Sequence, residues 1–166
     1  CSLLGSGLSE STAKHFFLQI CRAVKFLHER NIAHLDIKAE NILVNKNHNI
    51  KLCDFGYAQR LANITLQKDK MFGSVEYAPP EVRQGKCEDL LKVDIWSLGI
   101  LLHYLLTNGF PTLKKSKRRT SLSVNRAILS LSTHCTDLLH GLLQIKPSAR
   151  LSIHQVLNHT WMQASL

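Results

Sequence analysis

The stretch from Val93 to Leu106 most restricts how this chain can fold, because it is apolar on nearly every side of a helix. A surface helix carries one apolar stripe, whereas a helix that is apolar all round must be buried. Asp94, Ser97 and His103 interrupt the run, which is also shorter than the roughly 20 residues that a membrane span needs. We therefore expect a buried central helix with the other elements packed around it.

Two patterns predict a helix and a hairpin before this run. Residues 9–28 repeat apolar side chains at helical spacing, with Ser9 suited to the N-cap and Glu10 favourable in the first turn. Two short apolar stretches, 42–44 and 50–52, enclose a polar turn. We expect an amphipathic helix that packs one face on the core, followed by a small β hairpin.

The remaining chain completes one compact domain. A basic surface loop is expected at 114–119, with two or three helices from about Val124 to Met162. With 166 residues, of which 45% are apolar, the chain is long enough for one sizeable core. No internal repeat or low-complexity tract divides the sequence. The expected fold is a single domain that is mainly α with a small β element.

Charge and cysteine content limit the class of protein only coarsely. The formal net charge of +9 predicts attraction to a nucleotide, a nucleic acid, a phosphoprotein, an acidic peptide or a membrane surface. No signal-peptide pattern is visible, and the start at a cysteine rather than methionine predicts upstream removal or a fragment. The cysteines lack disulfide or zinc-ligand spacing, so we expect reduced thiols in an intracellular protein; they are Cys1, Cys21, Cys53, Cys87 and Cys135.

Residue types that carry chemistry concentrate in two short motifs. The first is HLDIKAEN at residues 34–41, and the second, DFG at 54–56, begins eighteen positions after Asp36. The first resembles the protein kinase catalytic-loop pattern H-R-D-L-x-x-x-N, with Leu35 in place of arginine. The second is similar to the magnesium motif of the same family. In this order and spacing, the two motifs together are highly specific for protein kinases.

The resemblance covers essentially the whole chain. Residues 73–81 (GSVEYAPPE) are similar to the end of a kinase activation segment, and residues 94–99 (DIWSLG) to the family's central-helix signature. The closing segment at 159–162 (HTWM) most resembles the calmodulin-dependent kinase group. The resemblance implies that residues 1–166 form one partial catalytic domain. This would be the large C-terminal lobe of the α+β kinase fold, mainly α with a small β hairpin, without the N-terminal lobe.

The resemblance also implies a role for individual residues. Asp36 would accept or orient the proton of the substrate hydroxyl, and Lys38 would contact the transferring phosphate. Asn41 and Asp54 offer the hard oxygen ligands that Mg²⁺ prefers. Leu43 would lie under the adenine ring. The implied catalytic residues are Asp36 and Lys38, and the implied cofactors are ATP, bound by Asn41, Leu43 and Asp54, and Mg²⁺, bound by Asn41 and Asp54.

Other motif residues are expected to support the fold. By resemblance, His34 and Phe55 would stack in the interior of the lobe. Asp94, on the central helix, would cap backbone amides of the catalytic loop. Glu81 and Arg150 would form a structural ion pair, so neither is expected to be catalytic.

The same resemblance indicates the class of substrate. Lys38 and the Gly73-Ser74 pair are typical of serine/threonine kinases rather than tyrosine kinases. The implied partners are ATP, protein substrates with serine or threonine acceptors, and a regulatory protein. No membrane partner is implied, and no motif favours nucleic acid. The expected location is the cytoplasm or the nucleus.

Two departures from the family pattern bear on activity. Leu35 replaces the arginine that holds an activation-loop phosphate in many kinases, so we expect activity that does not depend on phosphorylated Thr65. The chain also contains no G-x-G-x-x-G-x-V loop, no V-A-I-K lysine and no partner glutamate. Since those groups orient the ATP phosphates, the isolated chain is expected to be a poor catalyst or none.

Two other classes of function stay open, and so does the role of the basic run. A kinase-like scaffold that binds partners without catalysis fits the missing lobe, whereas a nucleic-acid-binding helical domain rests only on charge. The run at 114–119 is a solvated loop, a nuclear-import signal or a patch for an acidic partner. Arg118 and Arg119 precede Thr120 and Ser121, which resembles a phosphorylation site for a basophilic kinase.

Overall fold

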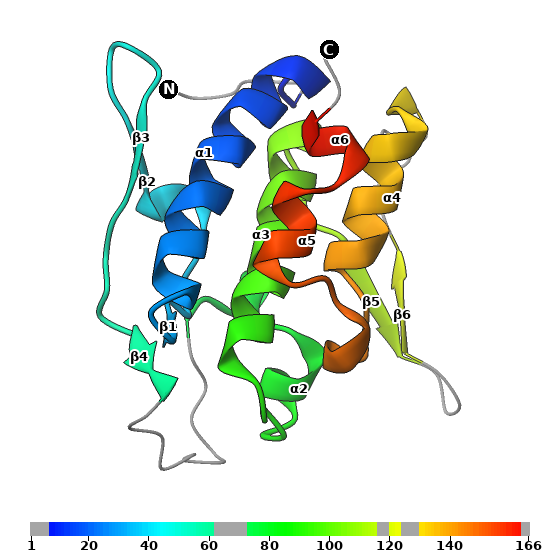
Figure 1. Cartoon of the computed structure of the whole chain (residues 1–166). Coiled ribbons are helices and arrows are strands. Elements are labelled where there is room, and N and C mark those ends of the chain that lie inside the picture. Colours follow the sequence, from blue (N-terminus) through cyan, green and yellow to red (C-terminus); the bar gives the residue numbers. More distant parts are fainter. Residues whose placement is uncertain (1–6, 62–72, 116–119, 124–129, 164–166) are drawn as a thin grey trace.

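Helices surround one central helix in the computed structural model, which describes residues 7–61, 73–115, 120–123 and 130–163 (Figure 1). The central helix is α3, Leu90–Thr107, and both α1 (Glu10–His28) and α4 (Thr133–Leu142) pack against it. The short helix α5, Ile153–Leu157, packs on α1. The predicted fold class, mainly α with a small β hairpin, is confirmed.

Helix α3 is buried on nearly all sides, as its apolar sequence predicts. It is long and apolar enough to cross a membrane, but 72% of it is buried inside the protein, so it is the core helix. Asp89 caps its start by accepting hydrogen bonds from the amides of Leu91 and Lys92. The helix ends at Thr107, and the left-handed backbone (φ 49°) of its C-cap, Asn108, closes the last turn.

Helix α1 is amphipathic, as predicted. Ser9 is its N-cap and accepts a hydrogen bond from the Thr12 amide at 3.2 Å. Its first-turn carboxylate, Glu10, accepts hydrogen bonds from Ser132 and from Trp161 Nε1. The two ends of the chain are thereby joined. The buried face of α1 comprises Ala13, Phe17, Ile20, Cys21, Val24, Leu27 and His28.

The predicted hairpin lies beside α1. Strand β2, Ile42–Val44, pairs antiparallel with β3, Ile50–Leu52. A second pair, β1 (Ile32–Ala33) with β4 (Gln59–Arg60), was not predicted, because two-residue strands leave no periodic pattern. Together the two pairs frame the segment that carries both chemical motifs.

The expectation of a surface loop at 114–119 is wrong in part. Lys114 and Lys115 end a strand, β5 (Thr112–Lys115), which pairs with β6 (Thr120–Ser123), while 116–119 lie outside the described residues. Lysines are usually depleted in strands, which explains the error. Thr120 and Ser121 lie in β6. The expected C-terminal helices are present as α4, α5 and α6 (Thr160–Gln163), and a further short helix, α2, spans Pro80–Arg83.

Candidate active site

The first motif follows β1 and is anchored to the central helix by one buried carboxylate. Asp94 accepts hydrogen bonds from the amides of His34 and Leu35, each at 2.8 Å. It also accepts one from His28 Nε2 at 2.8 Å. The predicted capping role of Asp94 is confirmed. The hydrogen bond from His28 was not predicted, because nothing in the sequence around a single histidine indicates a buried carboxylate partner.

His34 connects the two motifs. Its Nδ1 accepts a hydrogen bond from the Asp36 amide at 3.3 Å, so the ring proton is assigned to Nε2, which donates to the Cys53 carbonyl at 3.2 Å. The ring also contacts that of Phe55, with centroids 4.9 Å apart. The predicted contact between His34 and Phe55 is present, but the two rings are tilted by 57° rather than stacked, and Phe55 is 51% exposed rather than interior. It places the second motif against the first.

Asp36 lies at the centre of the site, and its carboxylate accepts hydrogen bonds from Lys38, Asn41 and Ser74. Its Oδ2 accepts hydrogen bonds from Lys38 Nζ at 2.8 Å and from Asn41 Nδ2 at 3.0 Å. Its Oδ1 accepts hydrogen bonds from the amide and the hydroxyl of Ser74, at 3.1 and 3.2 Å. The structure therefore brings Asp36, Lys38 and Asn41 together, as predicted.

The two charges of this cluster stabilise each other. Burial raises the pKa of Asp36, but hydrogen bonds from Lys38 and Asn41, with the charge of Lys38, outweigh it and hold the pKa below its ordinary value. The pKa of Lys38 is raised by its hydrogen bond to Asp36 and by the nearby charges of Asp36, Glu40 and Asp54. At neutral pH the site therefore holds a carboxylate beside an ammonium group.

Ser74 reaches both charged groups from a distant part of the chain. Besides its bonds to Asp36, its hydroxyl accepts a hydrogen bond from Lys38 Nζ at 2.9 Å. The preceding Gly73 has φ +65°, and a Cβ there would lie 2.3 Å from the Leu35 carbonyl oxygen. Only glycine allows this approach without a backbone shift. Gly73 and Ser74 belong to a motif that is visible in the sequence, but the sequence does not predict that Ser74 contacts Asp36 and Lys38.

Asn41 and Asp54 fit the role of hard metal ligands. Asn41 donates through Nδ2 to Asp36, and in the described part of the chain its Oδ1 has no hydrogen-bond partner. Asp54 is exposed, with φ +61°, and its Oδ1 accepts the Gly56 amide at 3.1 Å. Among the described residues no group of three or more His, Cys, Asp or Glu side chains could hold a metal alone. Oxygens of a bound phosphate would have to complete the coordination.

Leu35 is buried, with 2% of its surface exposed, in a small apolar cluster. Its backbone lies in the left-handed region, at φ +66°. Thr65, which enters the prediction about activation, lies outside the described residues. The buried members of this cluster, from β1, the first motif, the 74–83 segment and α3, are Ala33, Leu35, Ala78, Val82, Leu90 and Val93.

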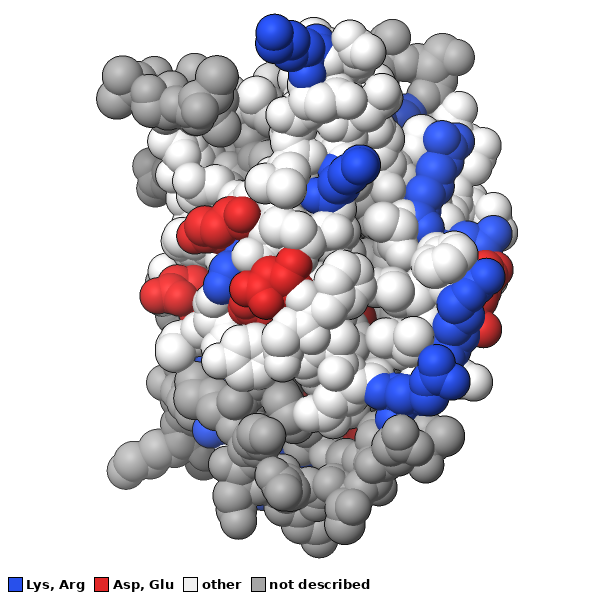
Figure 2. Space-filling view, turned by 90° about the vertical axis from the view of Figure 1, so that its left-hand side faces the viewer, with Lys and Arg blue, Asp and Glu red and all other residues white. Residues whose placement is uncertain are grey.

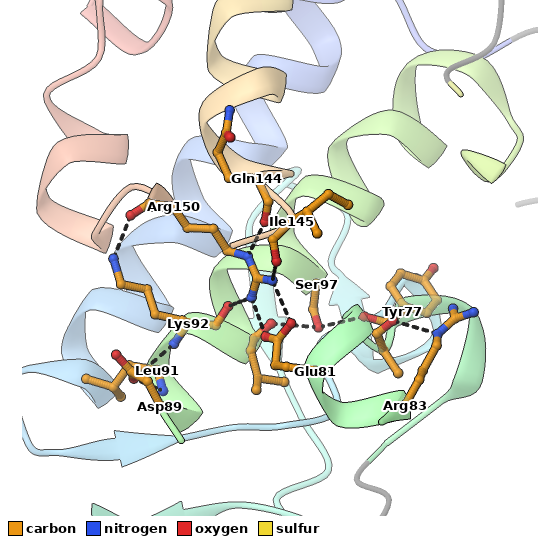
Figure 3. A network of polar contacts seen from close by, with 12 residues as sticks. Tyr77, Glu81, Arg83, Asp89, Leu91, Lys92, Ser97, Gln144, Ile145 and Arg150 are labelled. Carbon is orange, nitrogen blue, oxygen red and sulfur yellow. Dashed lines mark hydrogen bonds and ion pairs between the residues drawn. The ribbon is translucent and has the colours of Figure 1, made fainter. Parts of the chain in front are cut away.

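The predicted ion pair between Glu81 and Arg150 is confirmed, and it is the centre of a wider network (Figure 3). Arg150 donates to both carboxylate oxygens, at 2.6 and 2.8 Å. Its remaining donors reach the carbonyls of Gln144, Ile145 and Lys92. The network ties α2, which follows Ser74, to α3 and to the segment before α5.

The hairpin side of the molecule carries charge unevenly. Figure 2 shows a row of Lys and Arg side chains down the right-hand edge of this face, with acidic atoms beside it, and a group of Asp and Glu side chains on the left with a basic side chain among them. Four large apolar side chains of the hairpin and the second motif are also exposed, among them the predicted adenine contact Leu43 at 57%. They are Leu43, Val44, Phe55 and Tyr57.

Comparison with known proteins agrees with the geometry. The family model described as "protein kinase domain" matches residues 4–162. The serine/threonine-protein kinase kin-29 of Caenorhabditis elegans is 38% identical over 159 residues, which cover 93% of this chain and 19% of that protein. Its namesake in Caenorhabditis briggsae is 37% identical over 166 residues, covering 97% of this chain and 20% of that protein.

A vertebrate protein shows the same relation. The serine/threonine-protein kinase SIK3 homolog of Danio rerio is 40% identical over 160 residues, which cover 94% of this chain and 13% of that protein. The chain thus spans no more than 20% of the length of these curated relatives. The family resemblance drawn from the motifs is confirmed.

Proposed function

This chain belongs to the protein kinase family, and from that premise we propose that its site transfers the γ-phosphate of ATP to serine or threonine hydroxyls of proteins. The observation that carries the proposal is the cluster of Asp36, Lys38 and Ser74. There one hydroxyl oxygen lies 3.2 Å from a carboxylate and 2.9 Å from an ammonium group. Phosphoryl transfer to an alcohol is promoted by a carboxylate that orients the hydroxyl and by a cation that stabilises charge on the transferring group.

In the proposed reaction Asp36 orients the substrate hydroxyl and receives its proton. The lowered pKa of Asp36 keeps it ionised at neutral pH, so it is ready to accept a hydrogen bond. Lys38 carries its charge toward the transferring phosphate, with 21% of its side chain exposed. Asn41 holds Asp36 in place through two hydrogen bonds, at 2.8 and 3.0 Å. These contacts fix the orientation of the carboxylate before substrate arrives.

The oxygens of Asn41 and Asp54 would hold Mg²⁺, and exposed Leu43 would lie under the adenine of ATP. When bound, the metal ion neutralises charge on the phosphates. Groups that clamp the ATP phosphates from above are not found among these 166 residues. We therefore expect the isolated chain to be inactive, and the proposed activity belongs to the full-length protein.

The test measures phosphate transfer by the full-length protein from labelled ATP to serine, threonine and tyrosine peptide libraries. We expect Mg²⁺-dependent transfer to serine or threonine, and a loss of at least about 10³-fold in the variant Asp36→Asn. The matched control is Asp137→Asn, because Asp137 is an exposed carboxylate that pairs only with His159 among the described residues. Full activity of Asp36→Asn would contradict the proposal.

Exposed apolar side chains favour one second candidate, a kinase-like scaffold that binds partners. Leu43, Val44, Phe55 and Tyr57 are each more than 40% exposed, which suits a surface that another polypeptide covers. The same experiment separates the two functions. A full-length protein without Mg²⁺-dependent transfer, whose wild type and Asp36→Asn variant behave alike, would favour the scaffold.

A further inference from the structure

We propose that Arg83 is a positioning residue, which clamps the segment 75–78 so that Ser74 stays against Asp36 and protein substrates meet a preformed surface. The proposal about substrates rests on the proposed kinase function. The clamp itself is a property of the fold and can be tested without it.

The geometry is a two-point contact from one planar group. Arg83 Nη2 donates to the Val75 carbonyl at 2.6 Å, and Arg83 Nε donates to the Ala78 carbonyl at 2.9 Å. A guanidinium presents such donors in a rigid fork, and hydrogen bonds from a charged donor are stronger than neutral ones. Figure 3 shows Arg83 reaching back from α2 toward the residues around Tyr77.

The segment that Arg83 holds has little stability of its own. It is a single 3-10 turn, Val75–Tyr77, in which the Tyr77 amide donates to Ser74 O at 3.0 Å and the Ala78 amide to Val75 O at 3.2 Å. Such a turn has poor hydrogen-bond geometry and cannot propagate. Its order therefore depends on contacts from elsewhere in the fold.

Two different kinds of support hold the two sides of this turn. On the buried side, Tyr77 packs in the core, and its carbonyl accepts a hydrogen bond from Ser97 on α3 at 3.2 Å. On the outer side, Val75 is 52% exposed and provides little packing. In the part of the chain that the structure describes, Arg83 is the one side chain that bonds the carbonyls of Val75 and Ala78.

This support reaches the active site through the adjacent residue. Ser74 bonds Asp36 through both its amide and its hydroxyl, and its own carbonyl begins the turn that Arg83 holds. If the outer carbonyls are released, the turn opens and Ser74 can leave Asp36. Among the described residues, the side chains of Asn41 and Asp54 make no hydrogen bond to segment 75–78, so we expect ATP binding to be unaffected.

The test compares Arg83→Leu and Arg83→Lys with wild type in the full-length protein. The first readout is hydrogen exchange of the backbone amides in the 73–79 peptide, and α3 serves as an internal reference. We expect exchange at Ser74, Tyr77 and Ala78 to accelerate about tenfold in Arg83→Leu, with α3 unchanged. Arg83→Lys should recover part of this protection, because a lysine provides one charged donor but no fork.

The second readout separates a positioning role from a merely structural one. We expect Arg83→Leu to raise KM for the protein substrate about tenfold while KM for ATP stays at the wild-type value. The matched control, Lys86→Leu, removes an exposed positive charge three residues further along and should change neither readout.

The outcomes that would overturn the inference differ from those that would end the proposed function. Unchanged exchange at 73–79 in Arg83→Leu would overturn the clamp. Faster exchange with an unchanged substrate KM, or an equal KM effect in Lys86→Leu, would overturn its role in substrate positioning. A wild type that transfers no phosphate would end the proposed function, while hydrogen exchange would still decide the clamp.

Discussion

Two of the carboxylate–cation pairs among the described residues, the open pair Asp36–Lys38 and the enclosed pair Glu81–Arg150, differ in their surroundings. Asp36 and Lys38 meet at 2.8 Å, with 21% of the lysine side chain exposed. Glu81 and Arg150 meet at 2.6 Å, with none of the arginine side chain exposed. The lysine of the first pair is partly open to solvent, whereas the arginine of the second is enclosed by protein.

The surroundings of each pair explain the difference. Arg150 has its other donors satisfied by three backbone carbonyls, and its guanidinium lies 4.9 Å from the centroid of the Trp96 ring. Asp36 and Lys38 instead share the hydroxyl of Ser74, and part of the lysine side chain is open to solvent. A lysine suits the open pair because its ammonium is a compact charge, and an arginine suits the enclosed pair because its planar group can bond several acceptors at once.

The strongest test of this comparison removes the enclosed pair of Glu81 and Arg150. We expect Arg150→Ala to lower the free energy of unfolding by about 3–5 kcal/mol, because the Glu81 carboxylate would be left buried without its cation. Chemical denaturation of the full-length protein measures the loss. The matched control is Arg60→Ala on exposed β4, and a loss from Arg150→Ala no larger than that of the control would contradict the comparison.

A smaller effect is expected from a cation placed beside the open pair, Asp36 and Lys38. Leu35→Arg puts a charge into the apolar cluster of Ala33, Val82 and Leu90, and should cost about 3 kcal/mol of unfolding free energy. Leu43→Arg is the matched control, since the same change at an exposed position should cost less than about 0.5 kcal/mol. Equal stability of the two variants would show that Leu35 is not held in the cluster.

The smallest effect is expected from pH. Because the pKa of Asp36 is lower in the folded protein, its ionised form stabilises the fold above the unfolded value of about 3.9, and this contribution is lost as pH falls further. Asp36→Asn should therefore flatten the acid side of the stability curve, measured as unfolding midpoint against pH. Identical acid dependence in wild type and variant would contradict the lowered pKa.

The sequence predicted the site residues that lie near one another in the chain. Asp36, Lys38 and Asn41 are spaced within six residues, so a local motif carries their geometry. The partnership of Glu81 with Arg150 came from resemblance rather than spacing, since 69 residues separate them. Nothing in the pattern indicated the clamp by Arg83, because its acceptors are backbone carbonyls, which have no residue signature.

By itself, the sequence determined the buried central helix, the amphipathic first helix, the hairpin and the family, because periodicity and motif spacing are local properties. The tertiary structure alone decided that Ser74 lies against Asp36, that Leu35 is enclosed by apolar side chains, and that Lys114 belongs to a strand. Those facts depend on which distant segments meet. Contacts between distant segments are set by packing of the whole chain, which no short stretch encodes.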